Sequence, residues 1–239
     1  MVPFRVAVAL AGLLVAGRPG VPAMESGEGD DRVVRIVAGM VARNEQRLED
    51  LREYTARRRY QASNERFGQC ATVEVLERYE YPGRKRLEIE REEGSDYIRK
   101  KVIQRLLDSE MESSEDDRRD QTQITPRYYT FALLGEIERK GRATYVIEIE
   151  PREKKELLIR GRIWVDAEEL AIVRMEGSPV KKPSFWVTHA EVVREYEKHG
   201  PFWLPSSMES TSQILLAGPS RLRVEYSDYE IVRSAVTTD

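Results

Sequence analysis

The side chains best able to do chemistry are scarce in this sequence, which has two histidines and one cysteine. His189 and Glu191 stand two residues apart in a strand-like run, so they would share one face of the strand. Such a pair could ligate a metal ion, but two ligands at this spacing arise often by chance. His199 precedes Gly200 in a turn and is expected to be exposed. The pattern therefore favours neither a metal site nor a catalytic histidine.

Other signatures of catalysis do not rise above ordinary structure. No serine lies in a G-x-S-x-G elbow, and there is no glycine-rich phosphate loop. Cys70 has no histidine near it, so we expect a small buried strand residue rather than a nucleophile. Acidic residues gather in the segment Glu110–Asp120, where a metal site is one reading and a solvated helix end with a mobile loop is the favoured one. We expect no enzyme and no cofactor.

Three consecutive arginines, residues 57–59, interrupt a strand pattern in which Arg58 shares a face with Tyr54 and Tyr60. If that face turns inward, the guanidinium needs a partner, because a buried unpaired charge is very costly. The partner would be a carbonyl or phosphate of a ligand, or a glutamate of another strand. An exposed face, with no partner required, is the remaining alternative.

The composition suits one domain with a heavily charged surface, since 34% of the residues are charged and 40% are apolar. The net charge of -3 gives no electrostatic case for nucleic acid. Residues 1–23 predict a cleavable signal peptide, with Arg5, an apolar run over residues 6–16 and small residues before the cut. Export follows, and residues 24–239 would form a single domain. One cysteine permits no internal disulfide.

The elements that must position these residues are two helices and ten strands. A helix of about five turns, capped by Asp30 or Asp31, carries an apolar stripe that includes Val33, Ile36, Val37 and Met40. Strand patterns follow over residues 54–63, 71–81 and 84–92, and helical spacing over residues 95–109. The other expected strands are Tyr128–Glu138, Arg142–Glu150, Lys155–Val165, Leu170–Gly177, Ser184–Glu197, Phe202–Leu216 and Ser220–Val232.

Short turns between these strands imply antiparallel neighbours, and no strand-helix-strand alternation supports a parallel sheet. Long strands in an extended meander tend to curl. We therefore predict an α+β fold, mainly antiparallel β, built as an unclosed half β-barrel of about ten strands with helices over its concave face. The aromatic residues of the strands would be ordinary core or the lining of an apolar cavity. The lining would comprise Tyr54, Ala56, Arg58, Tyr60, Val73, Val75, Leu87, Ile89, Phe131, Leu133, Tyr145, Ile147, Trp164, Trp186 and Trp203.

This order of elements resembles the LolA/LolB-like superfamily of periplasmic outer-membrane lipoprotein carriers. The motifs that carry the resemblance are the G-x-I-W-V-D turn at Gly161–Asp166, the Arg-x-Glu strand at Arg174–Glu176 and the W-x-P segment at Trp203–Pro205. The resemblance implies a half-barrel whose cavity holds acyl chains. It also implies a first-strand arginine that acts in closing the cavity, for which Arg58 is the nearest candidate.

The sequence thus predicts a non-enzymatic periplasmic protein that binds lipid or the acyl chains of lipoproteins, acts as a monomer and contacts membranes transiently. The alternative is an envelope interaction or sensor module with a filled barrel, which binds envelope proteins and carries no lipid.

Overall fold

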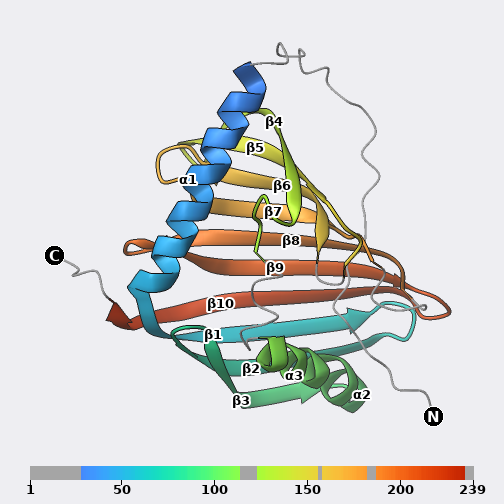
Figure 1. Ribbon diagram of the computed structural model, residues 1–239. Helices are drawn as coiled ribbons and strands as arrows, with labels where there is room; N and C mark the ends of the chain where they lie inside the picture. The colour runs from blue at the N-terminus through green and yellow to red at the C-terminus, as the bar shows by residue number, and fades with distance from the viewer. Residues whose placement is uncertain (1–27, 114–122, 156–157, 182–186, 235–239) are drawn as a thin grey trace.

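The computed structural model describes residues 28–113, 123–155, 158–181 and 187–234. Its strands form one antiparallel sheet in the order β3-β2-β1-β10-β9-β8-β7-β6-β5-β4 (Figure 1). The strands are β1 (Leu51–Asn64), β2 (Gln69–Glu80), β3 (Arg84–Gly94), β4 (Tyr129–Arg139), β5 (Arg142–Pro151), β6 (Ile159–Asp166), β7 (Ile172–Pro179), β8 (Val187–His199), β9 (Phe202–Ile214) and β10 (Gly218–Ser234). The last strand pairs with the first, which joins a three-stranded and a seven-stranded meander into one sheet.

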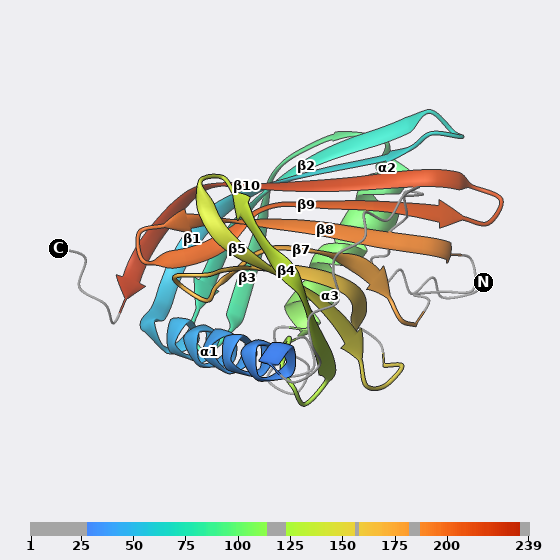
Figure 2. The same cartoon turned by 90° about the horizontal axis from the view of Figure 1, so that it is seen from above.

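The sheet curves but does not close, because β3 and β4 remain its two edges. Seen from above, it bends around the face that carries the helices (Figure 2). These are α1 (Glu28–Asp50) and a continuous segment of α2 (Asp96–Ile98), the π-helical turn η1 (Arg99–Ile103) and α3 (Gln104–Ser113). The predicted half-barrel of about ten antiparallel strands with helices on its concave face is confirmed.

The apolar stripe of α1 faces the sheet as its spacing predicts. Val33, Ile36, Val37 and Met40 are all buried in the main core. The helix already begins at Glu28, so the prediction that Asp30 or Asp31 caps its start is wrong. Since α1 ends at Asp50 and β1 begins at Leu51, the helix is joined to the sheet without an intervening loop.

The second helical segment covers the other end of the concave face, over β1 to β3 (Figure 1). The side chain of Ser95 caps its start by accepting from the backbone amide of Ile98. Its buried residues, Ile98, Ile103, Leu106 and Leu107, belong to the same core as the α1 stripe. The helix continues to Ser113, so Glu110 lies in α3 and not in the loop predicted for Glu110–Asp120. Residues 114–120 of that prediction lie outside the described residues.

Directly opposed residues of neighbouring strands share a face of a sheet. One such line, which we call the central row, crosses nine strands of the concave face. It consists of Val75, Arg58, Tyr226, and, one register step away, Tyr60, Val224, Met208, Arg194, Met175, Ile163, Ile147 and Leu133. Most of these side chains are apolar and buried, so the concave face is the inner face of the core.

Two glycines set the spacing between β6 and β7. Gly161 and Gly177 lie directly opposite each other in the pairing of these strands. A Cβ atom on Gly161 would overlap the backbone oxygen of Glu176, and one on Gly177 would overlap the backbone oxygen of Arg160. The pair therefore permits an approach of the two backbones that any side chain would prevent.

We expect Gly161→Ala to lower the free energy of unfolding by about 1–3 kcal/mol, because the added methyl group meets backbone rather than a flexible side chain. Urea denaturation measures the change. The control is Ser178→Ala, next to Gly177, which adds no atom and should stay within about 0.5 kcal/mol of the wild type. A Gly161→Ala protein as stable as the wild type would contradict the close approach.

Candidate functional site

The concave face carries a cluster of charged residues inside its apolar lining, centred on Arg58 of β1. Arg58 and Glu77 of β2 are 2% and 0% exposed, respectively. The Nε atom of Arg58 donates to Glu77 Oε2 at 2.6 Å, and its Nη1 atom donates to the hydroxyl of Tyr60 at 3.0 Å. The guanidinium also lies over the ring of Tyr226, 4.9 Å from its centre. Of the alternatives for Arg58, the structure has an ion pair with a glutamate of another strand.

Two further residues complete this set and join it to α3. Glu110 of α3 accepts from Arg58 Nη1 at 2.8 Å through one oxygen and from Lys85 Nζ of β3 at 2.8 Å through the other. Lys85 also lies 3.4 Å from Glu77. We call Arg58, Glu77, Lys85 and Glu110 the concave ion cluster. Its two cations and two carboxylates balance, and Glu110 is the member that holds a helix against the sheet.

The cluster shifts the proton affinities of its members. Burial raises the pKa of Glu110, but the charges of Lys85 and Arg58 and the hydrogen bonds that they donate outweigh it, so the pKa lies far below its ordinary value. For Lys85, burial alone would lower the pKa, but the charges of Glu110 and Glu77 outweigh it, so the pKa is raised above its ordinary value. Glu110 and Lys85 are therefore both charged at neutral pH, and the contact of α3 with the sheet is ionic.

Twelve of the fifteen residues predicted to line a cavity share the concave face. Tyr60, Val73, Val75 and Ile147 are buried in the main core, and Leu87, Phe131, Leu133 and Tyr145 pack against it partly buried. Tyr54 and Ala56 pack in a second cluster, and Ile89 is 37% exposed near the β3 edge. Arg58 belongs to the ion cluster. Ligand binding by these residues stays a prediction.

The two tryptophans that the structure describes do not join this lining. Trp164 alternates with the inward-facing Ile163, so it lies on the convex face, where Arg174 stacks over its ring at 5.2 Å from the centre. Trp203 lies at the end of the sheet and donates from its indole nitrogen to Glu169 at 3.0 Å. Trp186 lies outside the described residues. Assigning Trp164 and Trp203 to the cavity was wrong, because an aromatic residue in a strand says nothing of which face it occupies.

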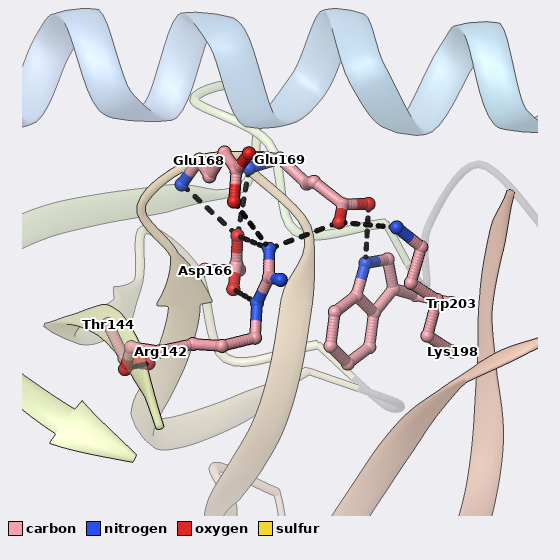
Figure 3. A network of polar contacts seen from close by, with 7 residues as sticks. All are labelled: Arg142, Thr144, Asp166, Glu168, Glu169, Lys198 and Trp203. Atoms are coloured by element: carbon pink, nitrogen blue, oxygen red, sulfur yellow. Dashed lines mark hydrogen bonds and ion pairs between the residues drawn. The ribbon is translucent and has the colours of Figure 1, made fainter. Parts of the chain in front are cut away.

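A second polar network ties together the ends of three hairpins (Figure 3). Arg142 of β5 donates from Nη2 to Asp166, the last residue of β6, at 3.0 Å and to Glu169 of the β6–β7 turn at 3.1 Å. Glu169 also accepts from Lys198 of β8 at 2.7 Å and from Trp203 of β9. We call these five residues the hairpin clasp.

The clasp borders a cleft of about 340 Å³, lined by residues that include Arg139, Thr144, Val173 and Tyr196. Burial raises the pKa of Asp166, but the hydrogen bonds from Arg142 and from the backbone of the turn lower it below its ordinary value. Every cation of the cleft has a carboxylate partner, since Arg139 pairs with Glu195 and Lys140 with Glu197. The cleft therefore holds no unmatched charge, and the motif residues around it act in the fold.

The residues first considered for chemistry lie apart in the structure. His189 is exposed on β8, and His199 packs against the ring of Tyr229, 4.6 Å between the ring centres. Cys70 is exposed, contrary to the prediction that it is buried, because it alternates with the buried Ala71 and so lies on the other face of β2. Within the described ranges, no three histidine, cysteine or acidic side chains are arranged to hold a metal ion. In the same ranges, no helix has the length and hydropathy of a membrane span.

Comparison with known proteins bears mainly on the fold. Residues 123–226, less than half of the chain, match the DUF5686 family, a family of unknown function. No curated protein matches the chain. It is similar to a DUF1329 family protein from Desulfovibrio piger (14% identity, 87% of this chain and 95% of that one, TM-score 0.44).

Two more similar structures belong to the group that the sequence resembles. One is a domain of a putative outer membrane lipoprotein-sorting protein from Vibrio parahaemolyticus, with 14% identity, 83% and 92% coverage and a TM-score of 0.42. The other is a LolA superfamily protein from Nitrosomonas europaea, with 10% identity, 82% and 93% coverage and a TM-score of 0.40. The structural neighbours of the chain thus include LolA superfamily proteins.

Four charged residues of the concave face were missed as site residues. In β2 the sequence places Glu77 in the same alternating phase as Val73, Val75 and Tyr79, and in β3 Lys85 shares the phase of Leu87. Arg194 is in phase with Ala190 and Val192 of β8. A charged residue among alternating strand positions that are otherwise apolar was the signal that could have identified Glu77, Lys85 and Arg194. Glu110 was misassigned because the helix was expected to end at residue 109.

We expect Glu77→Gln to lower the free energy of unfolding by about 3–5 kcal/mol, because it leaves the buried charge of Arg58 without its closest carboxylate. The control is Glu90→Gln, which breaks an exposed ion pair with Arg57. The side chain of Arg57 is 60% exposed and that of Glu90 is 36% exposed. That change should cost at most about 1 kcal/mol. Chemical denaturation of both variants tests the contrast, and equal losses would contradict the role given to burial.

The low pKa of Glu110 predicts a dependence of stability on acid. Because its folded pKa lies below the ordinary value of 4.5, its contribution is complete above about pH 4.5 and is lost as the pH falls through the folded pKa. The melting temperature of the wild type should therefore fall more steeply below pH 4.5 than that of Glu110→Gln. Asp108→Asn, an exposed change on the same helix, should follow the wild type. Parallel curves for all three proteins would refute the assignment.

Proposed function

We propose that this protein is a non-enzymatic binder or carrier of lipid or of the acyl chains of lipoproteins, and that the chains occupy the concave face of the sheet. The observation that carries the proposal is an apolar concave face covered by two helical segments that are attached in different ways. Export through a signal peptide at residues 1–23, with residues 24–239 as a single exported domain, is part of the same proposal.

The concave face has the chemistry that an acyl chain needs. Its rows are made of valine, isoleucine, leucine and methionine side chains, and each buried methylene group of a ligand contributes about 0.8 kcal/mol. Binding by ten methylene groups would therefore be favourable by roughly 8 kcal/mol before the cost of association. No catalytic group is required for such an interaction.

The two covers differ in how firmly they are held. Helix α1 continues directly into β1, and its Arg32 pairs with Glu136 of the edge strand β4 at 2.6 Å. Segment α2–α3 contributes apolar side chains too, and Arg99 near its start pairs with Glu92 of β3. Near its end, Glu110 makes ionic contacts with β1 and β3. Ionic contacts can be exchanged for water or for another anion. We therefore propose that α3 moves away to admit the chain.

The runner-up, a partner segment added to a sheet edge, has less support. Such an addition needs a free and regular strand. Edge strand β3 carries many exposed charges, and β4 has an irregular register between Leu133 and Gly135. Both features discourage edge pairing. Envelope proteins would then be partners as donors or receivers of lipid.

The test measures lipid on the protein directly. Protein purified from its exporting cell should carry lipid detectable by mass spectrometry, and the lipid-stripped protein should bind a fluorescent fatty acid saturably. Glu110→Gln should take up the probe faster, on the order of tenfold if its ion pairs contribute about 1.4 kcal/mol to closure. Asp108→Asn, on the exposed side of α3, should match the wild type.

An absence of co-purified lipid together with an absence of probe binding would disprove the function. Probe binding at the same rate in the wild type and Glu110→Gln would disprove the movement of α3 and leave the binding face in place.

A further inference from the structure

Arg194 of β8 places a cation in the middle of the concave face. Its direct neighbours in the sheet are Met208 of β9 and Met175 of β7, and beyond them lie Val224 and Ile163. All four are buried members of the main core. The side chain itself is half-buried, so an apolar surface surrounds a guanidinium that retains some access to solvent.

The described residues satisfy this guanidinium only in part. Its Nη2 atom approaches the sulfur of Met208 at 3.5 Å, which is a weak acceptor. Its Nε atom is buried and has no hydrogen-bond partner. No carboxylate of the described residues forms an ion pair with it. Tyr196 is a side-chain hydrogen-bond partner, and Tyr226 and Glu110 act on it only through their charges. An unsatisfied polar group of this kind calls for an explanation.

Counting charges on the concave face shows what is missing. Arg58 and Lys85 are balanced by Glu77 and Glu110, because each of the two carboxylates contacts both cations. Arg194 is a third cation without a third carboxylate, so these five residues carry a net charge of +1. Arginine keeps its proton in proteins, so the imbalance cannot be removed by neutralisation. One negative charge from outside the described chain would complete the set.

We propose that Arg194 binds the anionic head of an acyl lipid whose chain lies along the concave face. The ligand class is a single-chain or lipid-anchored monoanion with two available oxygens, either a carboxylate or a phosphodiester. A guanidinium donates two parallel hydrogen bonds to such a head, and the flanking methionines and valine contact the first methylene groups. The inference rests on the proposed function and adds to it the charge of the ligand and the residue that binds its head group.

The test compares charged and neutral ligands of equal chain length on the lipid-free protein. One arm uses palmitate against methyl palmitate, and the other uses lysophosphatidylglycerol against zwitterionic lysophosphatidylcholine. We expect the wild type to favour the anion by about tenfold in at least one arm, which identifies the head as carboxylate or phosphodiester. In Arg194→Met the preference should fall to within about twofold while binding of the neutral ligand is kept.

Two controls separate a binding role from a structural one. Arg162→Gln removes the same charge from the convex face and should keep the preference, as should the conservative Arg194→Lys in part. The melting temperature of lipid-free Arg194→Met should equal or exceed that of the wild type, because the substitution removes an unpaired charge from an apolar row. A structurally required arginine would give a clear decrease.

The outcomes are distinct. If the wild type binds anionic and neutral ligands equally, or if Arg194→Met keeps the preference, the role of Arg194 is overturned and the acyl-binding function survives. If neither charged nor neutral ligands bind, the proposed function fails, and this inference fails with it.

Discussion

A buried guanidinium must have carboxylates around it, and this requirement determines how the second helical segment of the protein is placed. Arg58 lies in the apolar concave face, where leaving it unpaired would cost several kcal/mol. Glu77 from the neighbouring strand supplies one partner, and Glu110 from α3 supplies the other. Because Lys85 shares both carboxylates, the strands β1, β2 and β3 and the helix α3 meet at one neutral cluster. The cover of this end of the sheet therefore depends on electrostatics as well as on its leucines.

The sequence predicted the elements well because each has a strong periodic pattern. The α1 stripe of Val33, Ile36, Val37 and Met40 and the alternating strands between turn residues left few choices of element type, and short connections left few choices of neighbours. The sequence did not predict the pairing of β1 with β10. This pairing brings together the first and the last strand of the chain, so it depends on tertiary packing. The curvature that follows from that pairing decides which strand faces become concave.

The site was harder to predict because a single strand pattern does not identify its partner residues. Arg58 was found as a charge needing a partner, but its second partner, Glu110, lay 52 residues away in a helix whose end was placed too early. For the tryptophans the error was the opposite one, because structural residues were assigned to the ligand site. Trp164 and Trp203 stand in the motifs that resemble lipoprotein carriers, yet both make contacts that hold strands and turns, with Arg174 and Glu169. In this chain the recognisable motifs stabilise the fold, and the concave residues that would meet a ligand are less distinctive.

The two proposals are connected by the charges of the concave face. With α3 in place, three cations face two carboxylates, and Arg194 is the cation left over. If α3 moves away, Glu110 leaves with it, so three cations face Glu77 alone and the net charge rises from +1 to +2. An open concave face would thus attract an anionic head more strongly than a closed one, and the closed form would disfavour a second anion beside Glu110. The carboxylate of Glu110 and the head of the ligand are then competing partners for neighbouring cations, which links the movement of the helix to the charge of the lipid.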